Sequence, residues 1–122
     1  MYLQEPSYQS VVALVLGYDM ASEGGVLIGF REWLITRLAT GNNFAWPALV
    51  LRATFPDAVD VSAVVSANSE AQRRAIDRLF ELIAEFDDVR RAPDGLRKIY
   101  ADYEKWLKTQ PWYVPGSPSW VG

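Results

Sequence analysis

Hydrophobic residues in the second half of the chain recur at steps of three and four positions, the spacing of one face of an α-helix. Within residues 69–89, Ser69 is followed three residues later by Gln72, the capping-box pattern in which each side chain satisfies a free backbone N–H of the other. The sequence therefore predicts a long amphipathic helix that begins at Ser69. Its apolar stripe consists of Ile76, Leu79, Phe80, Ile83 and Phe86.

A second helical stripe follows after a few residues. Pro93 and Asp94 suit a first helical turn, because proline has no N–H to leave unbonded there and a carboxylate is favoured at the positive end of the helix dipole. Pro111 ends the run. The short connection between the two helices predicts an antiparallel C-terminal hairpin. The second stripe consists of Leu96, Ile99, Tyr100, Tyr103, Trp106 and Leu107.

The first half of the chain is less regular. Residues 26–38 are apolar on almost every side, which predicts a largely buried helix. Residues 8–21 are long enough for a helix, but the β-branched residues between Val11 and Leu16 also favour a strand. Both possibilities stay open at this point.

The remaining segments complete the outline of the fold. Trp46 and Pro47 open a short helix that Pro56 stops, and residues 57–68 hold either another short helix or an extended segment. Residues 110–122 contain several prolines and glycines and should form an irregular tail. We expect a single, mainly α domain of five or six helices over residues 1–122, with an α+β fold as the alternative if residues 11–16 form a strand.

Composition narrows the chemistry of the 122-residue chain. It contains no cysteine and no histidine, which excludes disulfides, thiolate nucleophiles, imidazole bases and the usual zinc sites. We therefore predict no metal and no cofactor. Fifteen acidic residues against twelve basic ones give a net charge of −3, and this charge disfavours binding to nucleic acid. The N-terminus lacks a basic region and a long apolar run, so we expect no signal peptide, no membrane span and a cytoplasmic location.

Charged residues in the first half could line a pocket between helices. Asp19 and Glu23 are four residues apart, and Arg31 and Glu32 follow in the next predicted helix. Close carboxylates can act as acid and base, and an arginine can bind a carboxylate or phosphate, so these residues could bind a small ligand or catalyse hydrolysis. The structural interpretation is favoured, in which an acid caps a helix end and Arg31 pairs with Asp19.

Four acids form a ridge along the long predicted helix: Asp77, Glu81, Glu85 and Asp88. Like charges at four-residue spacing destabilise a helix by roughly 0.2–0.5 kcal/mol per pair, which invites a functional interpretation as a docking surface for a basic partner. Arginines before and after the ridge also allow a solvated face whose charges are compensated internally, and this second interpretation is favoured.

The aromatic tail is the last candidate surface. Trp112, Tyr113 and Trp120 could anchor a protein partner or pack on a neighbouring copy of the chain. The favoured interpretation is that these rings fold back over the helical hairpin and seal the core. The oligomeric state stays open.

Residues 17–51, GYDMASEGGVLIGFREWLITRLATGNNFAWPALVL, resemble segments of small bacterial proteins, some of which look like immunity proteins of polymorphic toxin systems. This resemblance implies a cytoplasmic, non-enzymatic protein that binds a cognate toxin domain and blocks its active site. Together with the acidic charge, it makes an inhibitor of a basic toxin domain the leading hypothesis. The alternative is a small-ligand-binding protein or a carboxylate-dependent hydrolase.

Overall fold

Six helices and no strand form within residues 7–22, 25–40, 44–66 and 68–112, the parts of the chain that a computed structural model describes. The mainly α prediction is confirmed. The alternative strand over residues 11–16 is wrong, because these residues lie inside the first helix. The helices are α1 (Tyr8–Ala21), α2 (Phe30–Leu38), α3 (Trp46–Thr54), α4 (Val61–Ser66), α5 (Ser69–Arg91) and α6 (Gly95–Lys108).

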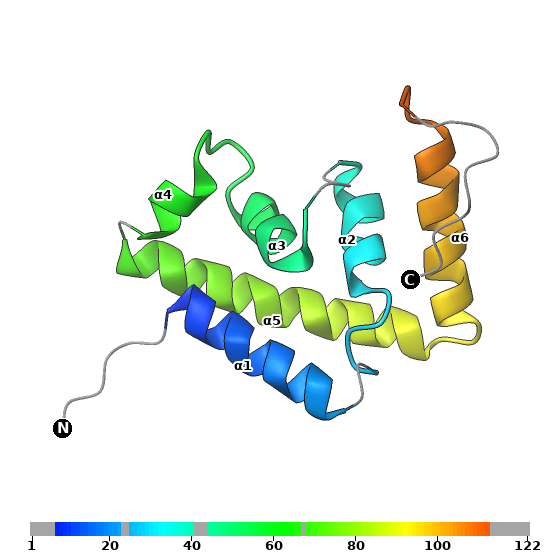
Figure 1. The fold of residues 1–122 in the computed structure, drawn as a ribbon, viewed down its shortest axis with the longest axis horizontal. Coiled ribbons are helices and arrows are strands. Elements are labelled where there is room, and N and C mark those ends of the chain that lie inside the picture. The colour runs from blue at the N-terminus through cyan, green and yellow to red at the C-terminus, as the bar shows by residue number, and fades with distance from the viewer. Residues whose placement is uncertain (1–6, 23–24, 41–43, 67, 113–122) are drawn as a thin grey trace.

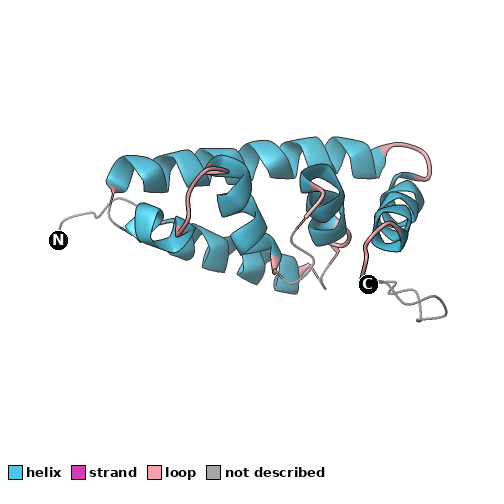
Figure 2. Cartoon of the chain, turned by 90° about the horizontal axis from the view of Figure 1, so that it is seen from above, coloured by secondary structure: helices cyan, strands magenta, loops and turns pink. Residues whose placement is uncertain are grey.

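The long helix α5 organises the fold, since each of the other five helices contacts it. Figure 1 shows α1 along one side of α5, with α2, α3 and α4 on the other side. Helices α5 and α6 follow one another through a short turn, as expected for a helical hairpin, but the predicted antiparallel arrangement is wrong. Figures 1 and 2 show α6 crosswise to the end of α5, where it does not fold back along α5. In this position α6 packs beside α2.

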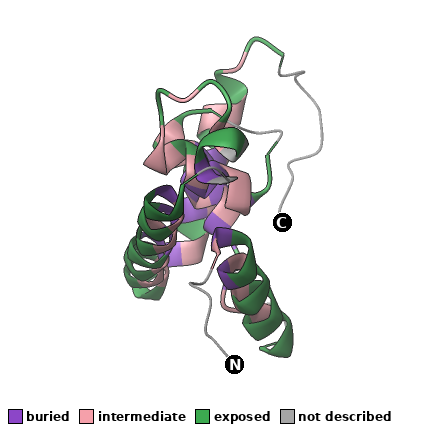
Figure 3. Ribbon diagram, turned by 90° about the vertical axis from the view of Figure 1, so that its left-hand side faces the viewer, coloured by how far each residue is buried: buried purple, intermediate pink, exposed green. Residues whose placement is uncertain are grey.

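The core lies where α2, α3 and α5 meet, and Figure 3 shows buried residues at this convergence and exposed residues on the outer sides of the helices. Phe30 is fully buried, and its ring contacts the rings of Trp33, Trp46 and Phe86 at centroid distances of 5.2–6.1 Å. The other large side chains with almost no exposed surface are Leu34, Ile35, Leu49, Val50, Leu79 and Leu82.

Helix α5 begins as predicted at Ser69, but the capping interaction is different. Asn68 is the capping residue, and its side chain accepts hydrogen bonds from the backbone N–H groups of Glu70 and Ala71 at 2.8 and 3.2 Å. The predicted capping box of Ser69 and Gln72 is therefore wrong. A capping box does occur in α1, where Ser7 is the capping residue and Ser10 is its partner.

Two helices begin later than the sequence indicates. The predicted helix over residues 26–38 begins only at Phe30, because Gly29 adopts a left-handed backbone conformation with φ 87°. Asp94, with φ 57°, is the residue before α6, so Pro93 lies outside the helix. Gly95 follows directly and is buried against the carbonyl groups at the end of α5, where a Cβ atom would overlap backbone oxygens.

The remaining predictions concern α3, α4 and the stripe of α5. Trp46 and Pro47 do open a short helix, and α4 confirms the helical option for residues 57–68. In the stripe of α5, Phe80 is half exposed, so its assignment to the core is wrong. Leu82, which was not in the predicted stripe, is buried in the core. The buried face of α5 also includes Ala75, so this face is rotated around the helix relative to the predicted stripe.

Candidate binding surfaces

The charged residues proposed for an inter-helical pocket do not form one site. The Asp19 carboxylate accepts a hydrogen bond from the backbone N–H of Leu27 at 2.9 Å, which ties the end of α1 to the following turn. Arg31 donates to the carbonyl of Phe44 at 2.9 Å and pairs with Glu32 at 3.6 Å instead of with the expected Asp19. Glu23 lies outside the described residues.

Glu32 is a buried carboxylate with only 5% of its surface exposed. Besides Arg31, it interacts with the hydroxyl group of Tyr100 from α6. Burial, and to a lesser extent the nearby negative charge and hydrogen bond of Glu32, raise the pKa of Tyr100. A buried charge with a cation and a hydroxyl donor is a satisfied structural group that links α2 to α6.

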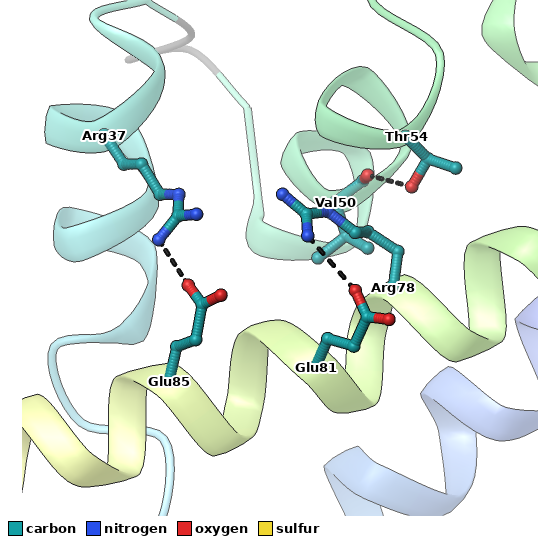
Figure 4. Close-up of polar contacts among 6 residues, drawn as sticks. All are labelled: Arg37, Val50, Thr54, Arg78, Glu81 and Glu85. Atoms are coloured by element: carbon teal, nitrogen blue, oxygen red, sulfur yellow. Dashed lines mark hydrogen bonds and ion pairs between the residues drawn. The ribbon is translucent and has the colours of Figure 1, made fainter.

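The acidic ridge of α5 lies on the side of the helix that faces α2 and α3. Figure 4 shows Glu85 directed at Arg37 of α2, with which it forms an ion pair, and Glu81 directed at Arg78 of α5 at 3.1 Å. The other two acids of the ridge, Asp77 and Asp88, are exposed. Half of the ridge is thus compensated within the fold.

The internal ion pairs leave the ridge accessible. The Glu81 side chain is 63% exposed and the Glu85 side chain 44% exposed. Exposed ion pairs contribute only about 0–1 kcal/mol, because water screens both charges. A partner cation can therefore compete with Arg37 or Arg78 for these carboxylates at little cost.

Of the aromatic tail, only Trp112 falls within the described residues; Tyr113 and Trp120 lie outside them. Trp112 is 53% exposed, and its ring packs edge-on against Trp106 with a centroid distance of 6.4 Å. Trp106 packs in turn on the core. One ring of the tail thus rests on α6 and covers the hairpin in part.

The outer face of α1 is an exposed apolar surface that was not predicted from the sequence. Leu14 is 71% exposed, Tyr18 65% and Met20 78%, although they lie in a helix with a single charged residue. A helix that is apolar on all sides is normally buried, so the signal was present in the residues around Val11 and Leu16.

A cavity of about 430 Å³ opens between α1, α3 and α5. Its polar groups satisfy one another: the Tyr8 hydroxyl donates to the carbonyl of Pro47 at 2.6 Å, and Gln72 accepts a hydrogen bond from the Tyr8 backbone N–H at 2.6 Å. Gln72 also donates to the carbonyl of Val65 at 2.9 Å. The Tyr8 hydroxyl thus connects α1 to α3, and Gln72 connects α5 to both α1 and α4, which gives Gln72 a structural role.

Three general findings bear on function. No group of three or more acidic, histidine or cysteine residues in the described part of the chain could hold a metal ion. None of the helices built from described residues combines the length and apolarity needed to cross a membrane. The chain matches no protein-family model, no curated protein and no solved structure.

Proposed function

We propose that this protein is a non-enzymatic protein-binding module, and specifically an immunity-type inhibitor that binds and neutralises a basic toxin domain in the cytoplasm. The observation that carries the proposal is the exposed row of four acids along α5, the longest helix. The net charge of −3 and the resemblance of residues 17–51 to immunity proteins support it.

The ridge has the properties that electrostatic docking requires. A rigid helix of 23 residues holds its carboxylates in fixed positions, so binding orders few side chains. Asp77 and Asp88 are exposed, and the pairs of Glu81 and Glu85 are weak enough to be exchanged for a partner's arginine or lysine. Complementary charge also accelerates the encounter of two proteins.

The ligand-binding or hydrolytic alternative has less support. It needs Asp19, Arg31 and Glu32 around one substrate, but Asp19 is bonded to a backbone N–H whereas Arg31 and Glu32 pair with each other. Catalytic carboxylates need access to substrate, and Glu32 is almost fully buried. These groups behave as parts of the scaffold.

The proposal predicts a toxin-like domain encoded beside this protein's gene, and the test measures association with that domain. Asp77 and Asp88 form no ion pair with the part of the chain that the structure describes. Reversing both, in the double variant Asp77→Lys and Asp88→Lys, should slow association at low salt at least 10-fold. These positions are chosen because the ion pairs of the ridge are formed by Glu81 and Glu85, so the double variant keeps both ion pairs. Stopped-flow measurements at two salt concentrations give the association rate and show how strongly salt reduces it by screening the charges.

The matched control changes the net charge by the same amount elsewhere. The control variant replaces two other exposed residues, Asp57 and Asp102, by lysine. Its association rate at high salt should stay within about twofold of that of the original chain. At low salt the ridge variant should be much slower than this control. Equal rates for the two double variants would remove the ridge from the proposal, and the absence of any binding to the neighbouring domain would refute the immunity function.

A further inference from the structure

We propose that two copies of this chain pair through the outer face of α1 to form a symmetric dimer. This interface is separate from the acidic ridge. Contacts of Gln72 with Tyr8, and of Arg90 with the turn after α1, mark the side of α5 on which α1 lies. The ridge residues Glu81 and Glu85 face α2 and α3 on the other side.

The outer face of α1 breaks the usual rule for a surface helix. Asp19 is the single charged residue among its 14 residues, and its carboxylate is already bonded to the Leu27 N–H. In Figure 1, α1 lies at the edge of the molecule, and α5 is its main neighbour. Leu14, Tyr18 and Met20 are each at least 65% exposed. Water contact with such a face is unfavourable, and a partner surface would remove it.

The area of this face suits a dimer. Leu14 and Tyr18 lie on one flank of the outer face and Leu16 and Met20 on the other. Their exposed parts together present roughly 500 Å² of surface, within the range of the largest apolar patch on a typical monomer. A contact that covers both flanks on each copy would bury on the order of 1,000 Å², about the minimum for a specific interface.

Helical spacing places small residues along the middle of the exposed face. Ala13, Gly17 and Ala21 follow one another at four-residue steps, and all three are exposed. Leu14 lies to one side of this row and Met20 to the other. The space around Gly17 is open: apart from its chain neighbours and the backbone of its own helix, no atom lies within 4 Å of where a Cβ would be. A second helix can therefore approach the backbone closely while the larger side chains pack around the contact.

The lack of free charge on the outer face of α1 favours binding of a second copy of the chain there over binding of the basic partner in the proposed function. A basic surface would find no free carboxylate on this face to pair with its cations. In a two-fold symmetric contact the same patch lies on both sides, so any charge on it would face a like charge. Two chains of net charge −3 can associate most readily through a face that is free of unpaired charges.

The first experiment measures molar mass by light scattering over a dilution series. The full chain of 13.7 kDa should show twice that mass at the high end of the series. The double variant Leu14→Lys and Met20→Lys should show the monomer mass with an unchanged circular dichroism spectrum, because both side chains are more than 70% exposed and contribute little to the core. The control Val59→Lys changes a fully exposed residue outside α1 and should remain dimeric.

The second experiment locates the symmetry axis. The chain has no cysteine, so a single introduced thiol reports one contact. If the two-fold axis of the dimer passes through the middle of the exposed face, residue 17 of one chain lies beside residue 17 of the other. This holds for both a parallel and an antiparallel pair of α1 helices. Gly17→Cys should form a disulfide-linked dimer under mild oxidation, and Ala63→Cys on α4 should not. A monomer at every concentration, or a dimer unaffected by the two lysines in α1, would overturn the proposal.

Discussion

Gln72 provides the sharpest test of how the helices are held together. Its side chain accepts a hydrogen bond from the backbone N–H of Tyr8 and donates one to the carbonyl of Val65. The Tyr8 N–H is at the start of α1, where helical backbone donors have no partner within the helix. Replacing Gln72 by methionine keeps the side-chain volume, removes both hydrogen bonds and leaves two partly buried backbone groups unsatisfied.

The expected loss follows from these two contacts. A lost hydrogen bond costs about 1 kcal/mol, and more when the remaining group is buried without a partner, so Gln72→Met should lower the free energy of unfolding by about 2 kcal/mol. Urea denaturation followed by circular dichroism measures the change, with every variant at the same protein concentration, because association also shifts apparent stability. The slope of the transition should stay constant.

Two neighbouring substitutions serve as controls for the Gln72 prediction. Asn68→Ala removes the observed cap of α5 and should cost about 1 kcal/mol. Ser69→Ala should change stability by less than about 0.5 kcal/mol, as for an ordinary surface substitution. The reasoning is refuted if Ser69→Ala is as costly as Gln72→Met, because a capping box between the two residues would produce that result. A Gln72→Met variant as stable as the original chain would also refute it.

Two further predictions concern Tyr8 and Gly95. Burial raises the pKa of Tyr8 above its ordinary value of 10.0, so above that pH the unfolded chain loses a proton that the folded chain keeps, and stability should fall by about 1.4 kcal/mol per pH unit. Urea denaturation between neutral and alkaline pH should show this slope reduced in Tyr8→Phe; an identical slope in both proteins would contradict the assignment. Gly95→Ala should cost about 3 kcal/mol, because the new methyl group would overlap the carbonyl oxygens of Val89 and Arg90. A urea midpoint equal to that of the original chain would show that this junction can relax.

Local patterns were sufficient to predict most helices. The three- and four-residue spacing in α5 and α6 depends only on which residues are apolar, and Pro47 and Pro56 bound α3 through backbone geometry alone. The start of α2 was misplaced because the left-handed conformation of Gly29 brings it against Leu96 and Ile99, and these contacts come from a distant part of the chain.

Side-chain partners could not be predicted in the same way. Asn68 competes with Ser69 for the cap of α5, and the backbone path into the helix decides between them. Arg31 is within reach of either Asp19 or Glu32 in sequence, but Asp19 is already bonded to the turn before α2. Sequence spacing names the candidates for a hydrogen bond or ion pair, and the relative position of two helices selects among them.

The sequence by itself determined the absence of cysteine and histidine chemistry and the excess of acidic over basic residues, and it favoured a mainly α fold over the α+β alternative. Only the tertiary structure decided which surfaces remain available for binding. The apolar residues of α1 extend around the whole helix, and α5 covers only one side of it, so Leu14 and Met20 stay exposed. The physical reason is that burial depends on which neighbouring elements cover a residue, and hydropathy along the chain does not contain that information.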